Sequence, residues 1–171
     1  MTRLKFLLSA IGCLLFGASL VAQELNVEHL KDMRTRNLGP AGMSGRVTSI
    51  DVDLSNPDII YAGTASGGLW RSESGGIDWE PIFEDQPTQS IGAVAVSQKN
   101  PSVIWVGTGE GNPRNSHNSG RGIFKSIDGG KNWMDMGLTE TRNIHRVIIH
   151  PDNPEIVFVG AMGSIWGNNE E

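Results

Sequence analysis

The sequence predicts an all-β fold made of repeated four-stranded antiparallel units, and two observations support this prediction. Residues 126–133 read Ser-Ile-Asp-Gly-Gly-Lys-Asn-Trp, and residues 72–79, fifty-four positions earlier, read Ser-Glu-Ser-Gly-Gly-Ile-Asp-Trp. In addition, three Asn-Pro dipeptides, beginning at positions 56, 100 and 153, each lie between two apolar stretches. Patterns that recur at intervals of this length indicate structural repeats.

The glycine-rich motif is interpreted as a hairpin turn. Each copy follows a short apolar stretch, at 68–71 or 122–125, and precedes a second one. We expect Asp128 to accept hydrogen bonds from backbone N–H groups of its own turn, the glycines to adopt positive φ, and the tryptophan to pack beneath the turn. The motif is therefore expected to specify the fold and not a reaction.

The Asn-Pro dipeptides separate two further strands in each repeat. Before them we expect strands at 50–52, 94–96 and 147–149, and after them come nearly continuous apolar runs at 59–63, 103–107 and 156–160, each with an aromatic residue at the same place. Continuous apolar runs indicate strands that are buried on both faces. One repeat is thus a strand, an Asn-Pro turn, a buried strand, a loop, a strand, a glycine-rich turn and a strand, which describes the blade of a β-propeller.

About two and a half blades are expected, so the ring is incomplete. Blade one is predicted at about 46–83, blade two at about 90–138, and a truncated blade three from about 143. Because propellers close at roughly 4 to 8 blades, we expect residues 34–171 to be the N-terminal part of a propeller whose remaining blades belong to the same, longer chain. A ring assembled from several copies is the alternative. Residues 23–33 are expected to be a lead-in segment, and residues 33–38 to form the outer strand of the last blade.

The N-terminus has the features of an export signal. Arg3 and Lys5 precede an apolar run at 6–21 that ends in small residues, which predicts a signal peptide at 1–22 and a secreted, periplasmic or cell-surface protein. A retained membrane anchor and a lipidation site at Cys13 remain as alternatives. Apart from this signal, no contact with a membrane is expected.

Composition excludes some classes of partner. The chain has 14 Lys and Arg against 19 Asp and Glu, for a net charge of −5. Removal of the predicted signal peptide makes the chain more acidic still, which disfavours nucleic acid as a partner. The single cysteine lies within the signal peptide, so disulfides are not expected to stabilise the fold. The four histidines show no metal-ligand spacing, and we expect neither a metal nor a cofactor.

The candidate binding residues lie mainly on one loop. The connection at 109–121 is ten residues longer than its counterpart in the first repeat and should lie on the face where propellers usually bind ligands. Its carboxylate, guanidinium, imidazole and carboxamide groups suit sugar hydroxyls, carboxylates or a peptide backbone. The alternative for the loop is a surface segment whose side chains hydrogen-bond to its own backbone. For Arg46, which precedes the first inner strand, the alternative is an ordinary salt bridge. The candidates are Glu110, Asn112, Arg114, Asn115, His117 and Arg121, together with Arg46.

The repeated motifs resemble those of Asp-box, or bacterial neuraminidase repeat, propellers, and in particular secreted bacterial sortilin or Vps10-like and glycosyl-hydrolase-type repeat proteins. This resemblance covers about residues 34–171 and implies a peptide or a glycan as ligand. Xyloglucan-cleaving relatives carry a catalytic aspartate in a Thr-Asp-x-Gly-Gly context, whereas residues 64–68 read Thr-Ala-Ser-Gly-Gly, with Ala65 at the aspartate position. The Arg-Ile-Pro strand of sialidases is also missing from residues 1–171.

These patterns favour an exported propeller that binds an extracellular polymer, either peptide or polysaccharide, without catalysis by the residues present. The alternative is a glycoside hydrolase, which normally requires two facing carboxylates, with those groups mostly beyond residue 171. Within the sequence only Glu84, Asp85, Glu110 and Glu140 are candidates for this role. A structural scaffold is a third interpretation, and it would need a large apolar patch.

Overall fold

The structure, a computed structural model, describes residues 46–112 and 117–163, and every statement below concerns these residues. They form three antiparallel sheets. The described residues contain no helix that is long and apolar enough to cross a membrane. The first sheet contains β1 (Val47–Val52), β2 (Ile60–Thr64), β3 (Leu69–Ser72) and β4 (Glu80–Pro81); the second contains β5 (Ile91–Val96), β6 (Ile104–Thr108), β7 (Ile123–Ser126) and β8 (Met134–Asp135); the third contains β9 (Asn143–Ile149) and β10 (Val157–Met162).

The predicted fold class is confirmed. In both four-stranded sheets the strands pair in chain order, as in a propeller blade, and the third sheet contains the first two strands of such a unit. The outer strands β4 and β8 are only two residues long. The predicted signal peptide at 1–22, the lead-in at 23–33 and the predicted closing strand at 33–38 lie outside the described residues.

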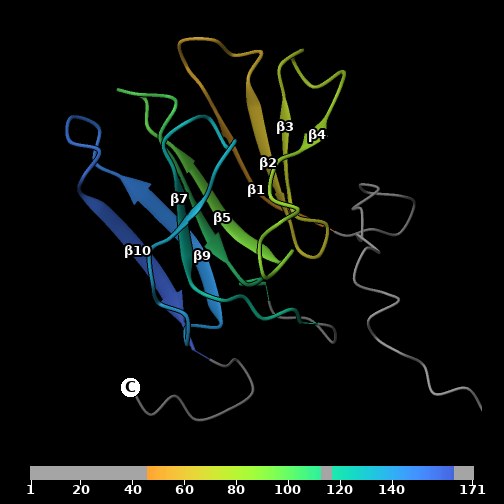
Figure 1. The fold of residues 1–171 in the computed structure, drawn as a ribbon, viewed down its shortest axis with the longest axis vertical. Helices are drawn as coiled ribbons and strands as arrows, with labels where there is room; N and C mark the ends of the chain where they lie inside the picture. The colour runs from red at the N-terminus through yellow and green to blue at the C-terminus, as the bar shows by residue number, and fades with distance from the viewer. Residues whose placement is uncertain (1–45, 113–116, 164–171) are drawn as a thin grey trace, which may run out of the picture. The chain divides into compact units, whose positions relative to one another are not determined.

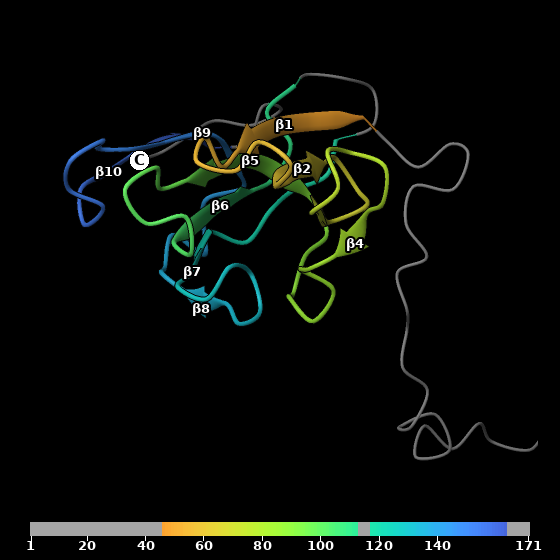
Figure 2. The same cartoon turned by 90° about the horizontal axis from the view of Figure 1, so that it is seen from above.

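The sheets lie one after another in the order of the chain (Figure 1). The inner strands are neighbours, because β1 packs against β5 and β5 packs against β9. Figure 2 shows β1, β5 and β9 along one edge, with β4 and β8 on the opposite side. This is the radial arrangement in which inner strands line a central channel.

Two apolar clusters hold the sheets together. The first lies between the first and second sheets and includes Tyr61, Leu69 and Phe83 from one side and Ile91, Val94 and Phe124 from the other. The second joins Ala93, Ala95 and Trp105 to Ile144 and Val147 of the third sheet. The second sheet therefore packs one face against the first sheet and the other against the third, which explains its continuous apolar run.

One aromatic position shows that burial of a strand depends on the neighbouring sheet. Tyr61, Trp105 and Phe158 occupy one position in the three repeats, but their exposed fractions are 3%, 8% and 62%. The first two are covered by the next sheet, and no described sheet follows β10. For this reason exposed side chains alternate with partly buried ones along β10, although the sequence there predicts burial on both faces.

Serine and carboxylate oxygens hold the glycine-rich hairpins, and the acceptor role predicted for Asp128 is confirmed. Ser126 Oγ accepts hydrogen bonds from the N–H of Asp128 at 3.3 Å and of Gly130 at 2.8 Å, and the Asp128 carboxylate accepts one from the N–H of Asn132 at 2.9 Å. Gly129 and Gly130 have φ of 72° and 89°. In the first sheet Ser74 replaces the aspartate, and its Oγ accepts the N–H of Asp78 at 2.8 Å. The degenerate copy therefore keeps the same turn.

Candidate functional site

The inner strand of each sheet has a β-bulge near its start. In β1, β5 and β9 the pairing register shifts by one residue near the start of the strand, at Thr48, Gly92 and His145. Such a bulge turns the local side chain out of the regular alternation. Because the inner strands are adjacent, these positions lie next to one another on the face from which the 109–121 loop extends.

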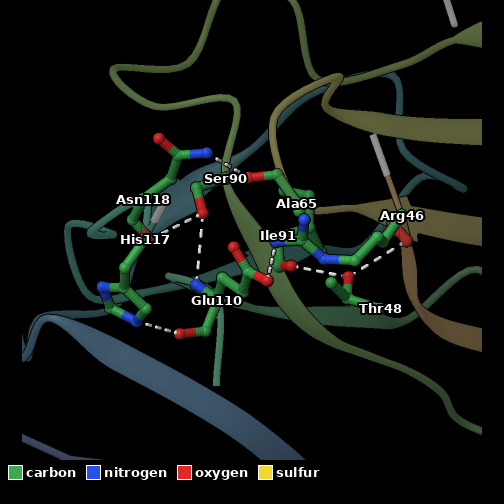
Figure 3. A network of polar contacts seen from close by, with 9 residues as sticks. Arg46, Thr48, Ala65, Ser90, Ile91, Glu110, His117 and Asn118 are labelled. Atoms are coloured by element: carbon green, nitrogen blue, oxygen red, sulfur yellow. Dashed lines mark hydrogen bonds and ion pairs between the residues drawn. The ribbon is translucent and has the colours of Figure 1, made fainter. Parts of the chain in front are cut away.

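The start of this loop is fixed to the first sheet by an ion pair. The carboxylate of Glu110 is completely buried and accepts a hydrogen bond from the guanidinium of Arg46, whose side chain is 31% exposed. Figure 3 shows Glu110 between Arg46 on one side and Ser90 and His117 on the other. Glu110 Oε2 and Arg46 Nε are buried without a partner among the described groups. The pair therefore joins the beginning of β1 to the loop that follows β6.

Backbone contacts hold the rest of the described loop in place. The N–H of Glu110 donates to Asn118 O at 3.0 Å and to Ser90 Oγ at 3.2 Å. The carbonyl oxygen of Glu110 lies 2.5 Å from His117 Nε2. Further along, the N–H of Arg121 donates to Thr108 Oγ1 at 2.7 Å. The loop is thus anchored at both ends, and these polar groups stabilise its shape.

A recess of about 370 Å³ lies where the loop passes over the inner strands. Gly92 of β5 lines it, and one wall is formed by the loop backbone at Gly111. A Cβ atom on Gly111 would lie 2.3 Å from Cβ and Cγ of His145, so only glycine allows this close approach. The lining residues are Thr48, Gly92, Gly111, Asn112, His145 and Arg146.

The recess continues into a groove along the inner strands. This groove, of about 560 Å³, runs between β1, β5 and β9 and shares Thr48, His145 and Arg146 with the recess. Asp51 contributes the carboxylate of the groove, and its two oxygens accept the N–H groups of Val52 at 2.9 Å and Val96 at 2.7 Å. The combined space is elongated and within the size range of ligand sites.

The structure brings together some of the predicted residues and separates others. Arg46, Glu110 and His117 form one cluster, but Glu110 is buried within it and His117 contacts its backbone. Asn112 lines the recess, and the side chain of Arg121 is exposed. The predicted residues Arg114 and Asn115 lie outside the described residues.

None of the residues that line the recess is acidic. Glu110 is enclosed in its ion pair, and Ala65, at the position discussed above, is 1% exposed. Glu84 and Asp85 line a separate groove, between the outer strand of the first sheet and the second glycine-rich hairpin. Within residues 46–112 and 117–163, no group of three or more His, Cys, Asp or Glu side chains is placed to bind a metal.

Sequence reasoning missed His145 and Arg146, which line both spaces. Both lie on β9 and are exposed. The alignment of the Asn-Pro repeats contains a usable signal, because it places Thr48, Gly92 and His145 at one position and Ser49, Ala93 and Arg146 at the next. At both positions the first two repeats have small or weakly polar residues, and only the third has a basic one.

Comparison with known proteins supports the fold. No protein-family model matches the chain. No curated protein matches it either. Among solved structures, the chain is similar to an ancestral GH74 enzyme, with 25% identity over 67% of this chain and 16% of that one and a TM-score of 0.56. It is also similar to the GH74 enzyme of Niastella koreensis, with 23% identity over 67% of this chain and 17% of that one and a TM-score of 0.51. The chain spans about a sixth of the length of these enzymes. It is a β-propeller portion.

Proposed function

We propose that this chain belongs to an exported β-propeller that binds an extracellular polysaccharide at the channel mouth, where the 109–121 loop meets the inner strands. The observation that carries the proposal is the recess under Gly111, which opens into an elongated polar groove. Elongated grooves with amide, hydroxyl and basic groups suit polymers rich in hydroxyl groups. The likeness to a GH74 enzyme favours a glycan over the peptide that sortilin-like relatives would imply.

Binding without catalysis is favoured by the positions of the acids. Hydrolysis of a glycosidic bond normally requires one carboxylate to donate a proton and a second to act as base or nucleophile. Glu110 is completely buried and ion-paired, so it does not face the recess as a free acid. The described residues therefore support positioning of a ligand, and the Asp-box hairpins serve as the turns of the scaffold.

The test is a binding assay with full-length protein and a panel of soluble polysaccharides in affinity gels. Asn112→Ala removes an exposed carboxamide from the recess, and Asn56→Ala removes one from the opposite face of the sheets as a matched control. We expect Asn112→Ala to weaken retention severalfold and Asn56→Ala to leave it unchanged. Failure to retain any polysaccharide, or equal effects of the two variants, would count against the proposal.

A glycoside hydrolase is the second candidate, favoured by the same GH74 likeness. Release of reducing ends by full-length protein distinguishes the two functions. If Glu110 took part in acid–base chemistry, Glu110→Gln would lower the rate by about 10² to 10⁴ while leaving binding nearly intact. If the protein only binds, no reducing ends appear with the wild-type chain.

A further inference from the structure

We infer that the recess under Gly111 recognises the carboxylate groups of an acidic polysaccharide, with Arg146 as the residue that binds the anion. This inference rests on the proposed function and narrows its ligand to glycans that carry uronic acids. It is independent of Glu110 and of the Arg46 ion pair.

The first step is the charge of the recess. Arg146 and His145 line it, and none of its six lining residues is acidic. No carboxylate within the described residues lies at ion-pair distance from Arg146, whereas Arg46, Arg71 and Lys125 each have one. Among the described residues, this acidic protein thus keeps an unpaired guanidinium at the opening of the groove along its inner strands.

The second step is the shape around this guanidinium. Gly92 lines the recess where the carbonyl oxygens of Gly109 and Ile144 leave no room for a side chain, and the backbone at Gly111 lies directly against the His145 ring, which fixes one wall. Asn112 and Thr48 line the same recess and supply a carboxamide and a hydroxyl group. A guanidinium binds a carboxylate through two parallel hydrogen bonds, and amide and hydroxyl groups bind the neighbouring sugar hydroxyls.

The third step is the extent of the site. The groove that continues from the recess is about 560 Å³ and contains His150 in addition to His145 and Arg146. The two oxygens of Asp51, its acidic residue, are already occupied by backbone N–H groups of Val52 and Val96. Because the Asp51 carboxylate keeps its negative charge, we expect the anionic unit to lie at Arg146 and the hydroxyl groups of further sugar units to lie along the groove, which a single small anion would not require.

The experiment compares polygalacturonate with its fully methyl-esterified form, because these two polymers share a backbone and differ in charge. Calorimetric titration of full-length protein is expected to show binding of the acidic form and at least tenfold weaker binding of the ester. Arg146→Gln should weaken binding of the acidic form by about tenfold or more and leave the ester unaffected. Arg146→Lys should restore part of the loss, because lysine keeps the charge but lacks the planar fork. Lys131→Gln removes one positive charge from the exposed hairpin of the second sheet and should change nothing.

Three outcomes would overturn the inference. Equal binding of the acid and the ester, or of wild type and Arg146→Gln, would leave polysaccharide binding intact but remove the role of the anion. Binding of poly-glutamate with the same dependence on Arg146, and of no polysaccharide, would show that the recess takes an acidic peptide and would also refute the proposed function. The thermal midpoints of the Arg146 variants serve as a control. Because Arg146 is exposed, these midpoints should equal that of the wild type, which would show that a loss of affinity is not a loss of fold.

Discussion

The indole N–H of Trp133 donates a hydrogen bond of 2.7 Å to the carbonyl of Ile82, which joins the hairpin of the second sheet to the end of the first. The same indole lies edge-on to the ring of Phe83, with centroids 5.0 Å apart. The glycine-rich motif therefore does more than turn the chain, because its tryptophan also fastens one blade to the preceding one.

Trp133→Phe should destabilise the protein by about 1 kcal/mol, since phenylalanine keeps an aromatic contact with Phe83 but leaves the Ile82 carbonyl without its donor. The equivalent Trp79 bonds to Gly76 O within its own turn and is 41% exposed, so Trp79→Phe is the matched control. Chemical unfolding measures both. A smaller effect for Trp133→Phe than for Trp79→Phe would contradict this account of the interface.

The Asp128 carboxylate is expected to make stability depend on pH. Hydrogen bonds from Asn132, from its side chain first and then its backbone N–H, lower the pKa of Asp128 from 3.8 to about 2. The folded pKa lies below the unfolded one, so the contribution is complete above about pH 4 and is lost as the pH falls towards 2.

Asp128→Asn should therefore reduce stability at neutral pH and make much less difference near pH 2. Asparagine can accept the N–H of Asn132, but its own amide group would face the Asn132 side-chain amide, donor against donor. Thermal midpoints between pH 2 and 6 measure the difference, and Ser74→Ala, in the hairpin that lacks the carboxylate, is the control. A gap between wild type and Asp128→Asn that stays constant over this range would refute the assigned cause.

The strands were predictable because each repeat contains the same turn and strand patterns. Asn-Pro turns, apolar runs and glycine pairs are local signals, and their repetition turned weak evidence into a firm assignment. Gly63 and Gly107 also reflect the contacts between blades. A Cβ there would lie 2.6 and 2.3 Å from Cγ2 of Ile91 and Ile144 in the next sheet, which explains why glycine ends both apolar runs.

The site was less predictable because it depends on distances between repeats. The sequence indicated that Arg46 and Glu110 were candidate binding residues, but not that they form a partly buried ion pair across 64 positions of the chain. Arg146 was missed for a related reason: it lies directly before the predicted strand at 147–149, and only the adjacency of β9 and β5 places it beside the loop.

The Arg46–Glu110 pair gives a third prediction. Arg46→Ala leaves a completely buried carboxylate without its counter-ion, and we expect a loss of about 2 kcal/mol, below the 3–5 kcal/mol typical of fully buried pairs because Arg46 is partly exposed. Adding Glu110→Gln should recover part of that loss, since the neutral amide no longer needs the cation. A double-mutant cycle by chemical unfolding measures the coupling. If the two losses simply add, the pair does not fasten the loop to β1.

The contact between Gly111 and His145 gives the last prediction, and it links the loop to the recess. Gly111→Ala would place a methyl group 2.2 Å from His145 Nδ1 and 2.3 Å from its Cβ and Cγ, so the loop or the strand must move. We expect weaker polysaccharide binding and a destabilisation of about 1–3 kcal/mol, the usual range for overpacking. His145→Gly removes the obstructing atoms, so the double variant Gly111→Ala/His145→Gly should recover the thermal midpoint lost by Gly111→Ala alone. Recovery of stability without recovery of binding would assign His145 itself to the ligand site, whereas no recovery of either would show that the loop does not lie against this ring.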